Sequence, residues 1–272
     1  MNSEKRSREF YILAGFFTLF VLFLYGPLSA ILILSFQGIN GGLTFPMNGV
    51  SLHWFANLFE QQAVGDFGGA FRRSLALGLM VMVVTVTVSL MAGLAFRRKF
   101  HGATVLFYLT VASLVVPSIV VSLGIGVMFQ QLGLDPMWYG SAFGAHLTWT
   151  LPFGVLIMLA IFNRFSPAYE EAARDLGASS WQSFRYVVLP MILPSLIGVG
   201  LFGFTLSYDE FARTLMTAGT FNTLPLEIYG MTTNVTTPVL YALGTLTTLF
   251  SFLIILVALA LIARTNRRRA QG

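Results

Sequence analysis

Six apolar segments, each long enough to cross a lipid bilayer, restrict the folds open to this chain more than any other feature. About twenty apolar residues in a helix span the hydrocarbon core of a membrane. With 56% hydrophobic and 10% charged residues, the chain is too apolar for a water-soluble domain. The sequence therefore predicts an all-α polytopic membrane protein with six transmembrane helices. The segments cover residues 10–36, 74–95, 103–129, 141–162, 191–211 and 239–263.

Three local features qualify this pattern. The first segment, residues 10–36, is longer than the core of a signal peptide and is followed by further spans, so we expect it to remain as a transmembrane helix. Pro117 interrupts the third segment and should bend it beside a cavity. The longest polar connection, residues 37–74, is expected to contain a short amphipathic helix around residues 52–59.

Basic residues indicate the orientation of the chain in the membrane. Its net charge of +5 could suggest nucleic acid, but the basic residues lie between apolar segments rather than on one face, so no nucleic acid is expected as a partner. If six segments cross, thirteen basic residues share one side and Arg72, Arg73 and Arg213 remain elsewhere. The positive-inside rule then places both termini in the cytosol. The thirteen are Lys5, Arg6, Arg8, Arg97, Arg98, Lys99, Arg164, Arg174, Arg185, Arg264, Arg267, Arg268 and Arg269.

The sequence offers little for catalysis on this chain. Its two lysines, Lys5 and Lys99, lie outside any Gly-x-x-x-x-Gly-Lys-Ser/Thr pattern, so energy from a nucleotide must come through a partner. There is no cysteine, which excludes disulfides. His53, His101 and His146 are not paired in sequence with a nucleophile and an acid, and no metal site is expected. An intramembrane enzyme remains an alternative.

The polar loop between the fourth and fifth segments, residues 164–190, is expected to form two short helices. Ser166 is a candidate N-cap of the first helix, and Pro167 suits its first turn. Gly177 can supply the left-handed residue that ends a helix. By the charge argument this loop is cytosolic.

The second helix of the loop should begin at Ser179 or Ser180. It is expected to carry Trp181 and other apolar residues on one face. Pro190 lacks an amide hydrogen and should stop this helix before the fifth segment.

The spacing of the loop resembles a known family. Glu171 to Ala173, then Gly177, then nine residues and Val187 to Pro190, is similar to the signature loop of permease subunits in binding-protein-dependent ABC importers, with valine at 187 where isoleucine is commoner. The resemblance implies that the first loop helix docks into a groove on a separate ATPase. Glu171 offers a charge to a basic partner or to the loop itself. The expected coupling residues are Glu170, Glu171, Ala172, Ala173, Asp175 and Gly177.

The end of the fifth segment carries the candidate substrate path: Ser207, Tyr208, Asp209 and Glu210, with Asp209 the first choice. A charge at the centre of a span costs about 2.5–3.5 kcal/mol and less near an interface, so carboxylates here are candidates for a cation pathway. The alternative is a structural ion pair with Arg213, three or four residues further on. One arginine cannot neutralise both acids, and adjacent helical positions point about 100° apart, so one acid is expected to face the path.

Further segments resemble the spermidine/putrescine subgroup of these permeases. They are residues 49–55 (Gly-Val-Ser-Leu-His-Trp-Phe), the Ser-x-Asp-acid pattern from Ser207, and residues 224–229 (Leu-Pro-Leu-Glu-Ile-Tyr). This resemblance implies a polyamine substrate, which would suit outer carboxylates at Asp209, Glu210 and Glu227. Another solute, such as an amino acid, an oxyanion or a phosphonate, remains open, as does a sensor component that uses the same docking helix.

The resemblance also implies an assembly. Residues 1–272 are expected to form a single transmembrane domain in a bacterial inner membrane, surrounded by lipids. The implied partners are two ABC ATPase subunits, a second homologous permease and a periplasmic solute-binding protein. ATP and Mg²⁺ would bind the ATPase, with no cofactor on this chain. Whether the second permease is an identical chain stays open.

Overall fold

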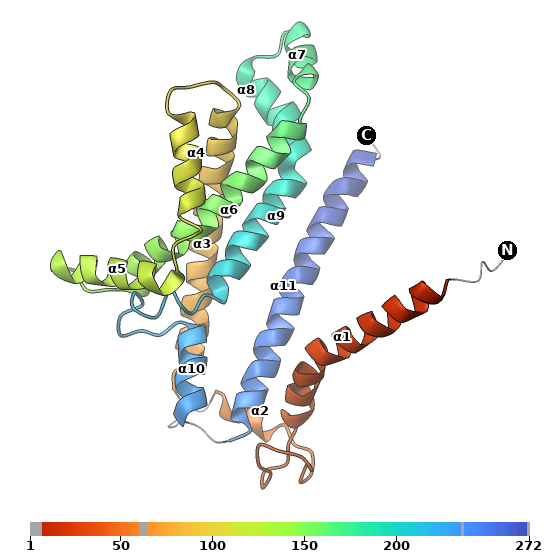
Figure 1. Ribbon diagram of the computed structural model, residues 1–272, viewed down its shortest axis with the longest axis vertical. Helices are drawn as coiled ribbons and strands as arrows, with labels where there is room; N and C mark the ends of the chain where they lie inside the picture. The colour runs from red at the N-terminus through yellow and green to blue at the C-terminus, as the bar shows by residue number, and fades with distance from the viewer. Residues whose placement is uncertain (1–6, 60–64, 235–236, 271–272) are drawn as a thin grey trace. The chain divides into compact units, whose positions relative to one another are not determined.

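A computed structural model describes residues 7–59, 65–234 and 237–270 (Figure 1). This part of the chain is helical and contains no strand beyond an isolated bridge between Gln37 and Val50. Two compact units are present, Met1–Gly65 with Met231–Phe252 and Asp66–Gly230 with Leu253–Gly272. Lys5 and Arg6, counted above among the cytosolic basic residues, lie outside the described residues.

Five helical runs in the described residues are long and apolar enough to cross a membrane, which confirms the all-α polytopic class. The apolar side chains of the first and last runs are largely exposed, with 6% of each spanning window buried, as expected for surfaces that face lipid or partner helices, whereas 28–44% of the windows of the other three runs is buried. The runs are α1 (Arg8–Leu34), α3 (Phe67–Phe96), a π-helix with α6 (Trp138–Arg164), α8 through α9 (Ser180–Tyr208), and most of α11 (Val239–Arg264).

The third apolar segment differs from the prediction of one continuous helix. It forms α4 (Ala103–Ala112) and α5 (Ser118–Gln131), which separate at Pro117. Figure 1 shows α5 running across the direction of α4. Proline lacks an amide hydrogen and forces the residue before it out of the helical region, so the expected bend becomes a break. With 10 and 14 residues, each helix alone is shorter than a span. The number of six spans therefore stays a prediction.

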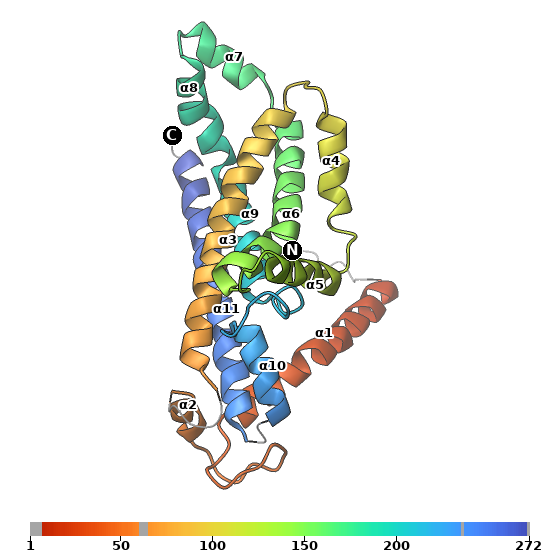
Figure 2. The ribbon, with the colours of Figure 1, turned by 90° about the vertical axis from the view of Figure 1, so that its left-hand side faces the viewer.

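Helices α3, α6 (Phe143–Arg164) and α9 (Leu189–Tyr208) form the core of the second unit and run side by side (Figure 2). Glycines allow the close approach: a Cβ at Gly93 would lie 2.9 Å from Met158 Cβ, and one at Gly78 would lie 2.9 Å from Phe204 Cε2. Small residues at such contacts are typical of membrane helices. The buried cluster between the helices comprises Met158, Phe162, Val188, Ile192, Leu196 and Val199.

Local capping shifts the ends of two predicted segments. Helix α3 begins at Phe67 rather than at residue 74, because the Asp66 carboxylate caps it and accepts a hydrogen bond from the Gly69 amide at 2.8 Å. The fifth segment ends at Tyr208 rather than at residue 211, and Asp209 is its C-cap. Both candidate carboxylates, Asp209 and Glu210, therefore lie beyond the last helical residue.

In the first unit, the polar connection after α1 folds around Gln37, whose side chain is fully buried. Gln37 Nε2 donates to the Gly42 carbonyl at 3.1 Å, and Gln37 Oε1 accepts from the Asn48 amide at 2.8 Å. The indole of Trp54, on α2 (His53–Asn57), donates to the Gln37 carbonyl at 2.9 Å. The short helix expected around residues 52–59 is therefore present, and its Trp54 side chain is buried.

Candidate functional site

The first helix of the polar loop is α7 (Ala168–Asp175). Its N-cap is Pro167, whose carbonyl accepts from the amides of Glu170 and Glu171 at 2.9 and 3.1 Å. The prediction that the Ser166 side chain caps this helix is wrong, because the helix begins one residue later and has no side-chain cap. Both glutamates lie in the first turn, where the helix dipole stabilises negative charge.

Gly177 ends α7 as the sequence predicts. Its φ of +85° lies in the left-handed region, and nothing lies within 4 Å of a Cβ built there. The Ala178 amide donates to the Ala173 carbonyl at 3.0 Å and the Gly177 amide donates to the Arg174 carbonyl at 2.8 Å, the pattern of a Schellman turn. Glycine is required here by backbone conformation rather than by space.

The second loop helix is α8 (Ser180–Ser183), with Ser179 and Gln182 forming a capping box. The prediction that Pro190 stops this helix is wrong. A π-helical turn (Phe184–Val188) follows α8 and leads directly into α9, where Pro190 occupies the first turn. A proline is tolerated there because its missing amide hydrogen would have no partner within the new helix. The polar loop is thus continuous with the fifth span.

The coupling residues predicted from the sequence lie mostly on an exposed surface. Glu171, Ala172, Asp175 and Gly177 are exposed, and Ala173 is half-buried. Three large apolar side chains are exposed beside them: Tyr169, Leu176 and Trp181. An exposed apolar group of this kind, rimmed by charge, is typical of an interaction surface.

Glu170 differs from its neighbour, since it is bound within the chain. Arg97, at the C-cap of α3, donates from Nη1 and Nη2 to the two Glu170 carboxylate oxygens at 3.0 and 2.7 Å. The hydrogen bond from Arg97 holds the pKa of Glu170 below its usual range, against the opposing effect of burial. Sequence reasoning missed this pair because 73 residues separate its members.

A cavity of about 810 Å³ adjoins this ion pair, between the end of α3, α7 and the start of α8. Its wall combines arginines with aromatic rings. The lining residues are Leu94, Ala95, Arg97, Arg98, Phe100, Glu170, Arg174, Ser180, Trp181 and Phe184.

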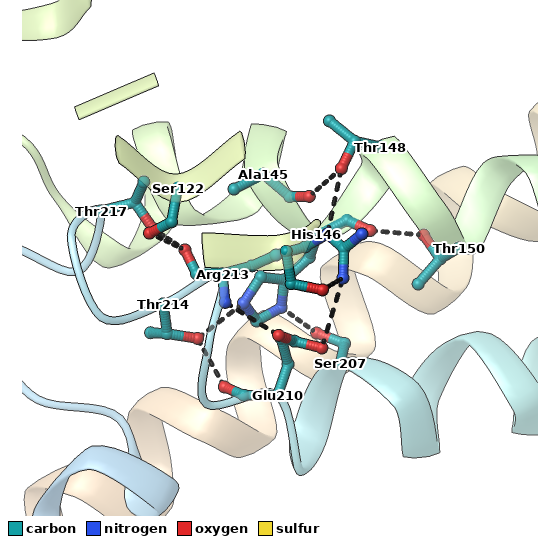
Figure 3. Close-up of polar contacts among 11 residues, drawn as sticks. Ser122, Ala145, His146, Thr148, Thr150, Ser207, Glu210, Arg213, Thr214 and Thr217 are labelled. Carbon is teal, nitrogen blue, oxygen red and sulfur yellow. Dashed lines mark hydrogen bonds and ion pairs between the residues drawn. The ribbon is translucent and has the colours of Figure 1, made fainter. Parts of the chain in front are cut away.

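A second polar region lies where α9 ends (Figure 3). His146, on α6, is fully buried, and its Nδ1 lies 2.8 Å from Ser207 Oγ. Its Nε2 lies 2.9 Å from Thr214 Oγ1, which donates to the Glu210 carbonyl. Both ring nitrogens are thus used in joining α6 to α9 and to the loop that follows. His146 was not predicted to have a role, and its sequence context carries no signal for one.

Arg213 is the centre of this region and is buried, at 2% exposure. Its amide donates to Glu210 Oε1 at 2.8 Å, and its Nη1 lies 3.8 Å from Glu210 Oε2. The guanidinium also donates to Thr148 Oγ1 and to Ser118 Oγ, at 3.2 and 2.6 Å, and lies over the ring of Trp149. The predicted alternative of an ion pair with Glu210 is therefore confirmed, although it forms in a turn rather than on a helix.

Of the four predicted path residues, only Asp209 is exposed. Ser207 is bonded to His146, and Glu210 is bonded to Arg213. Tyr208 is 7% exposed, with its ring stacked on Phe204 at a centroid distance of 5.6 Å. One acid of the adjacent pair is therefore buried and bonded, while the other is accessible.

Glu227, on α10 (Leu224–Asn234), is also engaged within the chain. Its carboxylate accepts from the Asp66 amide at 2.9 Å and from Asn222 Nδ2 at 2.8 Å. Arg73 completes this cluster, since it donates to the Asn222 carbonyl at 2.6 Å and pairs with Asp66 at 3.2 Å. Hydrogen bonding from the Gly69 amide and from Arg73 lowers the pKa of Asp66.

No group of three or more His, Asp and Glu side chains among the described residues could hold a metal ion.

Comparisons with known proteins are consistent over nearly the whole chain. Residues 85–271 match the family described as "Binding-protein-dependent transport system inner membrane component". The spermidine/putrescine transport system permease protein PotC of Escherichia coli (strain K12) is 28% identical over 260 residues, which cover 95% of this chain and 96% of that protein. The putrescine transport system permease protein PotI of the same strain is 26% identical, covering 91% and 89%.

Solved structures share the fold. A bacterial ABC transporter involved in the import of the acidic polysaccharide alginate gives a TM-score of 0.69 at 17% identity, covering 94% of each chain. An amino acid ABC transporter with histidines gives a TM-score of 0.55 at 19% identity, covering 74% of this chain and 93% of that one.

Proposed function

Because the chain belongs to the family of binding-protein-dependent transport system inner membrane components, we propose that it forms part of the path by which an ATP-driven importer moves a polyamine. The protein is a permease subunit of an ABC importer in the inner membrane, a transport component rather than an enzyme. The observation that carries the substrate proposal is the end-to-end similarity to permeases named for spermidine and putrescine, over 95% of this chain.

The exposed part of α7 is the proposed docking element for an ABC ATPase. In its support, Glu171 and Asp175 present charge and Leu176 presents an apolar side chain that is 90% exposed. The left-handed turn at Gly177 leads from α7 into a run that continues as the fifth span. Force applied to α7 by an ATPase would thus reach a spanning helix through a short and well-defined connection.

Asp209 is the proposed contact for the cationic solute. It is the exposed member of its acidic pair, and no ion pair or hydrogen bond of its carboxylate is found within the described residues. Glu210 and Glu227, the other outer carboxylates, are already bonded to groups of this chain. A polyamine carries several positive charges, and an exposed carboxylate attracts such a cation without the cost of breaking an internal pair.

The proposed assembly has two ATPase subunits that bind ATP and Mg²⁺, a second homologous permease and a periplasmic solute-binding protein. We further propose six spans with both termini and α7 in the cytosol. The distribution of thirteen basic residues against three supports this orientation.

The test is a complex rebuilt in lipid with the ATPase, the second permease and the binding protein of the same system. ATP hydrolysis is recorded with polyamines, amino acids, oxyanions and sugars as solutes. Stimulation by a polyamine alone is expected. Stimulation by a different solute would retain the importer and overturn the polyamine assignment, whereas no stimulation by any solute in an intact complex would overturn the coupling role.

A further inference from the structure

We propose that the ion pair between Arg97 and Glu170, here named the Arg97–Glu170 clamp, carries movement of α7 to the ends of α3 and α6. This inference rests on the proposed function, in which α7 docks on an ATPase. Arg97 is accordingly a positioning residue: it contacts neither solute nor nucleotide, and acts through α7.

The geometry of the clamp suits the transmission of force. Its two parallel hydrogen bonds, at 3.0 and 2.7 Å, fix both the distance and the angle between the carboxylate and the guanidinium. The side chains are only 23% and 17% exposed, so water competes with them less than at an open surface. A lysine at position 97 could not reproduce this arrangement, because an ammonium group lacks the planar fork.

The clamp also involves α6. The guanidinium carbon of Arg97 lies 5.2 Å from the ring centroid of Phe162 and 5.5 Å from that of Phe165, near the end of α6. Cation–π contacts at such distances are attractive. One turn earlier on α3, Gly93 lets the helix approach Phe162 and Met158 closely. The end of α3 therefore packs against α6 beside the residue that binds α7, and Figure 2 shows the two helices running side by side.

No other side chain of α7 makes a comparable connection. Within the described residues, the hydrogen bonds of Glu170 are the only ones that join an α7 side chain to a spanning helix. Most other contacts of α7 are with α8 and the π-helical turn that follow it in the chain, and the ring centroid of Tyr169 lies 5.9 Å from that of Phe165 at the C-cap of α6. Without the clamp, α7 would keep its connection to α9 through the following turn and the Tyr169 contact with Phe165, but no side-chain hydrogen bond would join it to α3.

The experiment compares solute transported per ATP hydrolysed in the lipid-embedded complex. The variants are Arg97→Gln, Glu170→Gln, Arg97→Lys and the exchange Arg97→Glu with Glu170→Arg. Lys99→Gln is the control, since it removes an exposed charge two residues from Arg97 without touching the clamp. Each single variant is expected to lower transport per ATP by roughly twofold to thirtyfold, the range for mutations along a coupling network.

The exchange variant is expected to recover part of the ratio, and the control to leave it unchanged. Recovery separates coupling from folding, because a purely structural defect would lower the amount of complex without altering transport per ATP. An unchanged ratio in both Gln variants, at normal complex levels, would overturn the clamp. Failure of the unaltered complex to couple hydrolysis to any solute would instead overturn the proposed function.

Discussion

Two regions of this permease each contain a pair of adjacent acids, and in each pair one acid is bonded to an arginine while the other is exposed. On α7, Glu170 binds Arg97 and Glu171 is exposed. After α9, Glu210 binds Arg213 and Asp209 is exposed. The arginine comes from a distant helix in the first region and from the same turn in the second.

This difference indicates different mechanical roles. A pair between distant elements resists their separation, so the α7 pair joins a surface loop to a spanning helix. A pair within one turn fixes the shape of that turn, and the buried contacts of Arg213 with Ser118 and Thr148 anchor the turn to α5 and α6. In both regions the bonded acid keeps its own segment of chain in position, and the neighbouring acid remains exposed to a partner or a solute.

The largest effect is expected at the turn after α7. Gly177→Asp should abolish transport while the protein remains in the membrane, because a residue with a Cβ is strained at a φ of +85° and the exit from α7 would change. Uptake is measured in cells with equal amounts of permease. Gly102→Asp is the matched control, since Gly102 has a φ of +88° and equal space but lies outside the polar loop.

Normal uptake by Gly177→Asp would rule out a coupling role for this turn. Equal loss in Gly102→Asp would show that strain alone, rather than its position, is responsible. Glu171→Lys tests the same surface without strain and is likewise expected to abolish uptake, because it reverses the exposed charge.

The next largest effect is expected for Arg213→Ala, which removes the guanidinium beside the buried Glu210 and leaves that carboxylate with the amide of residue 213 as a donor. Breaking a buried pair costs about 3–5 kcal/mol, so thermal unfolding of the purified protein should occur at a clearly lower temperature. Adding Glu210→Gln should restore part of the lost stability by removing a buried negative charge that no longer faces a guanidinium. Arg72→Ala, at an exposed arginine, should change little. Equal unfolding temperatures for the two Ala variants would contradict the anchoring role.

A smaller effect is expected for Asp209→Asn, which keeps the shape of the exposed side chain and removes its charge. The contribution of an exposed ion pair is about 0.2–1 kcal/mol, so uptake of a polyamine should weaken by up to about fivefold. The solute concentration for half-maximal uptake should rise by this factor, and the difference from the unaltered protein should shrink at high salt. Asp135→Asn, at another exposed acid, serves as the control. Unchanged uptake kinetics in Asp209→Asn would contradict the proposed contact with the solute and would leave Asp209 with a structural role.

The smallest effect is the pH dependence of the Arg97–Glu170 clamp. The hydrogen bond from Arg97 lowers the pKa of Glu170 in the folded protein, so the stability that it contributes is present above the unfolded pKa, about 4.3. It is lost only as pH falls through the lower, folded pKa. The difference in unfolding temperature between the unaltered protein and Glu170→Gln should stay constant from neutral to mildly acidic pH and shrink at lower pH. A difference that declines already between pH 8 and 6 would contradict this assignment.

Much of this architecture follows from local chemistry. Apolar length identifies the spanning helices, and the need for a left-handed residue identifies the end of α7 at Gly177. The effect of the prolines does not follow from local chemistry alone. Pro117 separates two helices where a bend was expected, whereas Pro190 is accommodated behind a π-helical turn. The outcome at each proline depends on whether neighbouring backbone groups find other partners.

Composition and the spacing of residues over about twenty positions are enough to predict the class of protein, the position of the polar loop and the family. Which acid of each pair is bonded, and the link that His146 makes between α6 and the loop after α9, are properties of the tertiary structure. Those choices depend on burial and on partners up to 73 residues away. A charged side chain takes its role from the groups that folding brings within hydrogen-bond distance, and sequence spacing does not encode that distance.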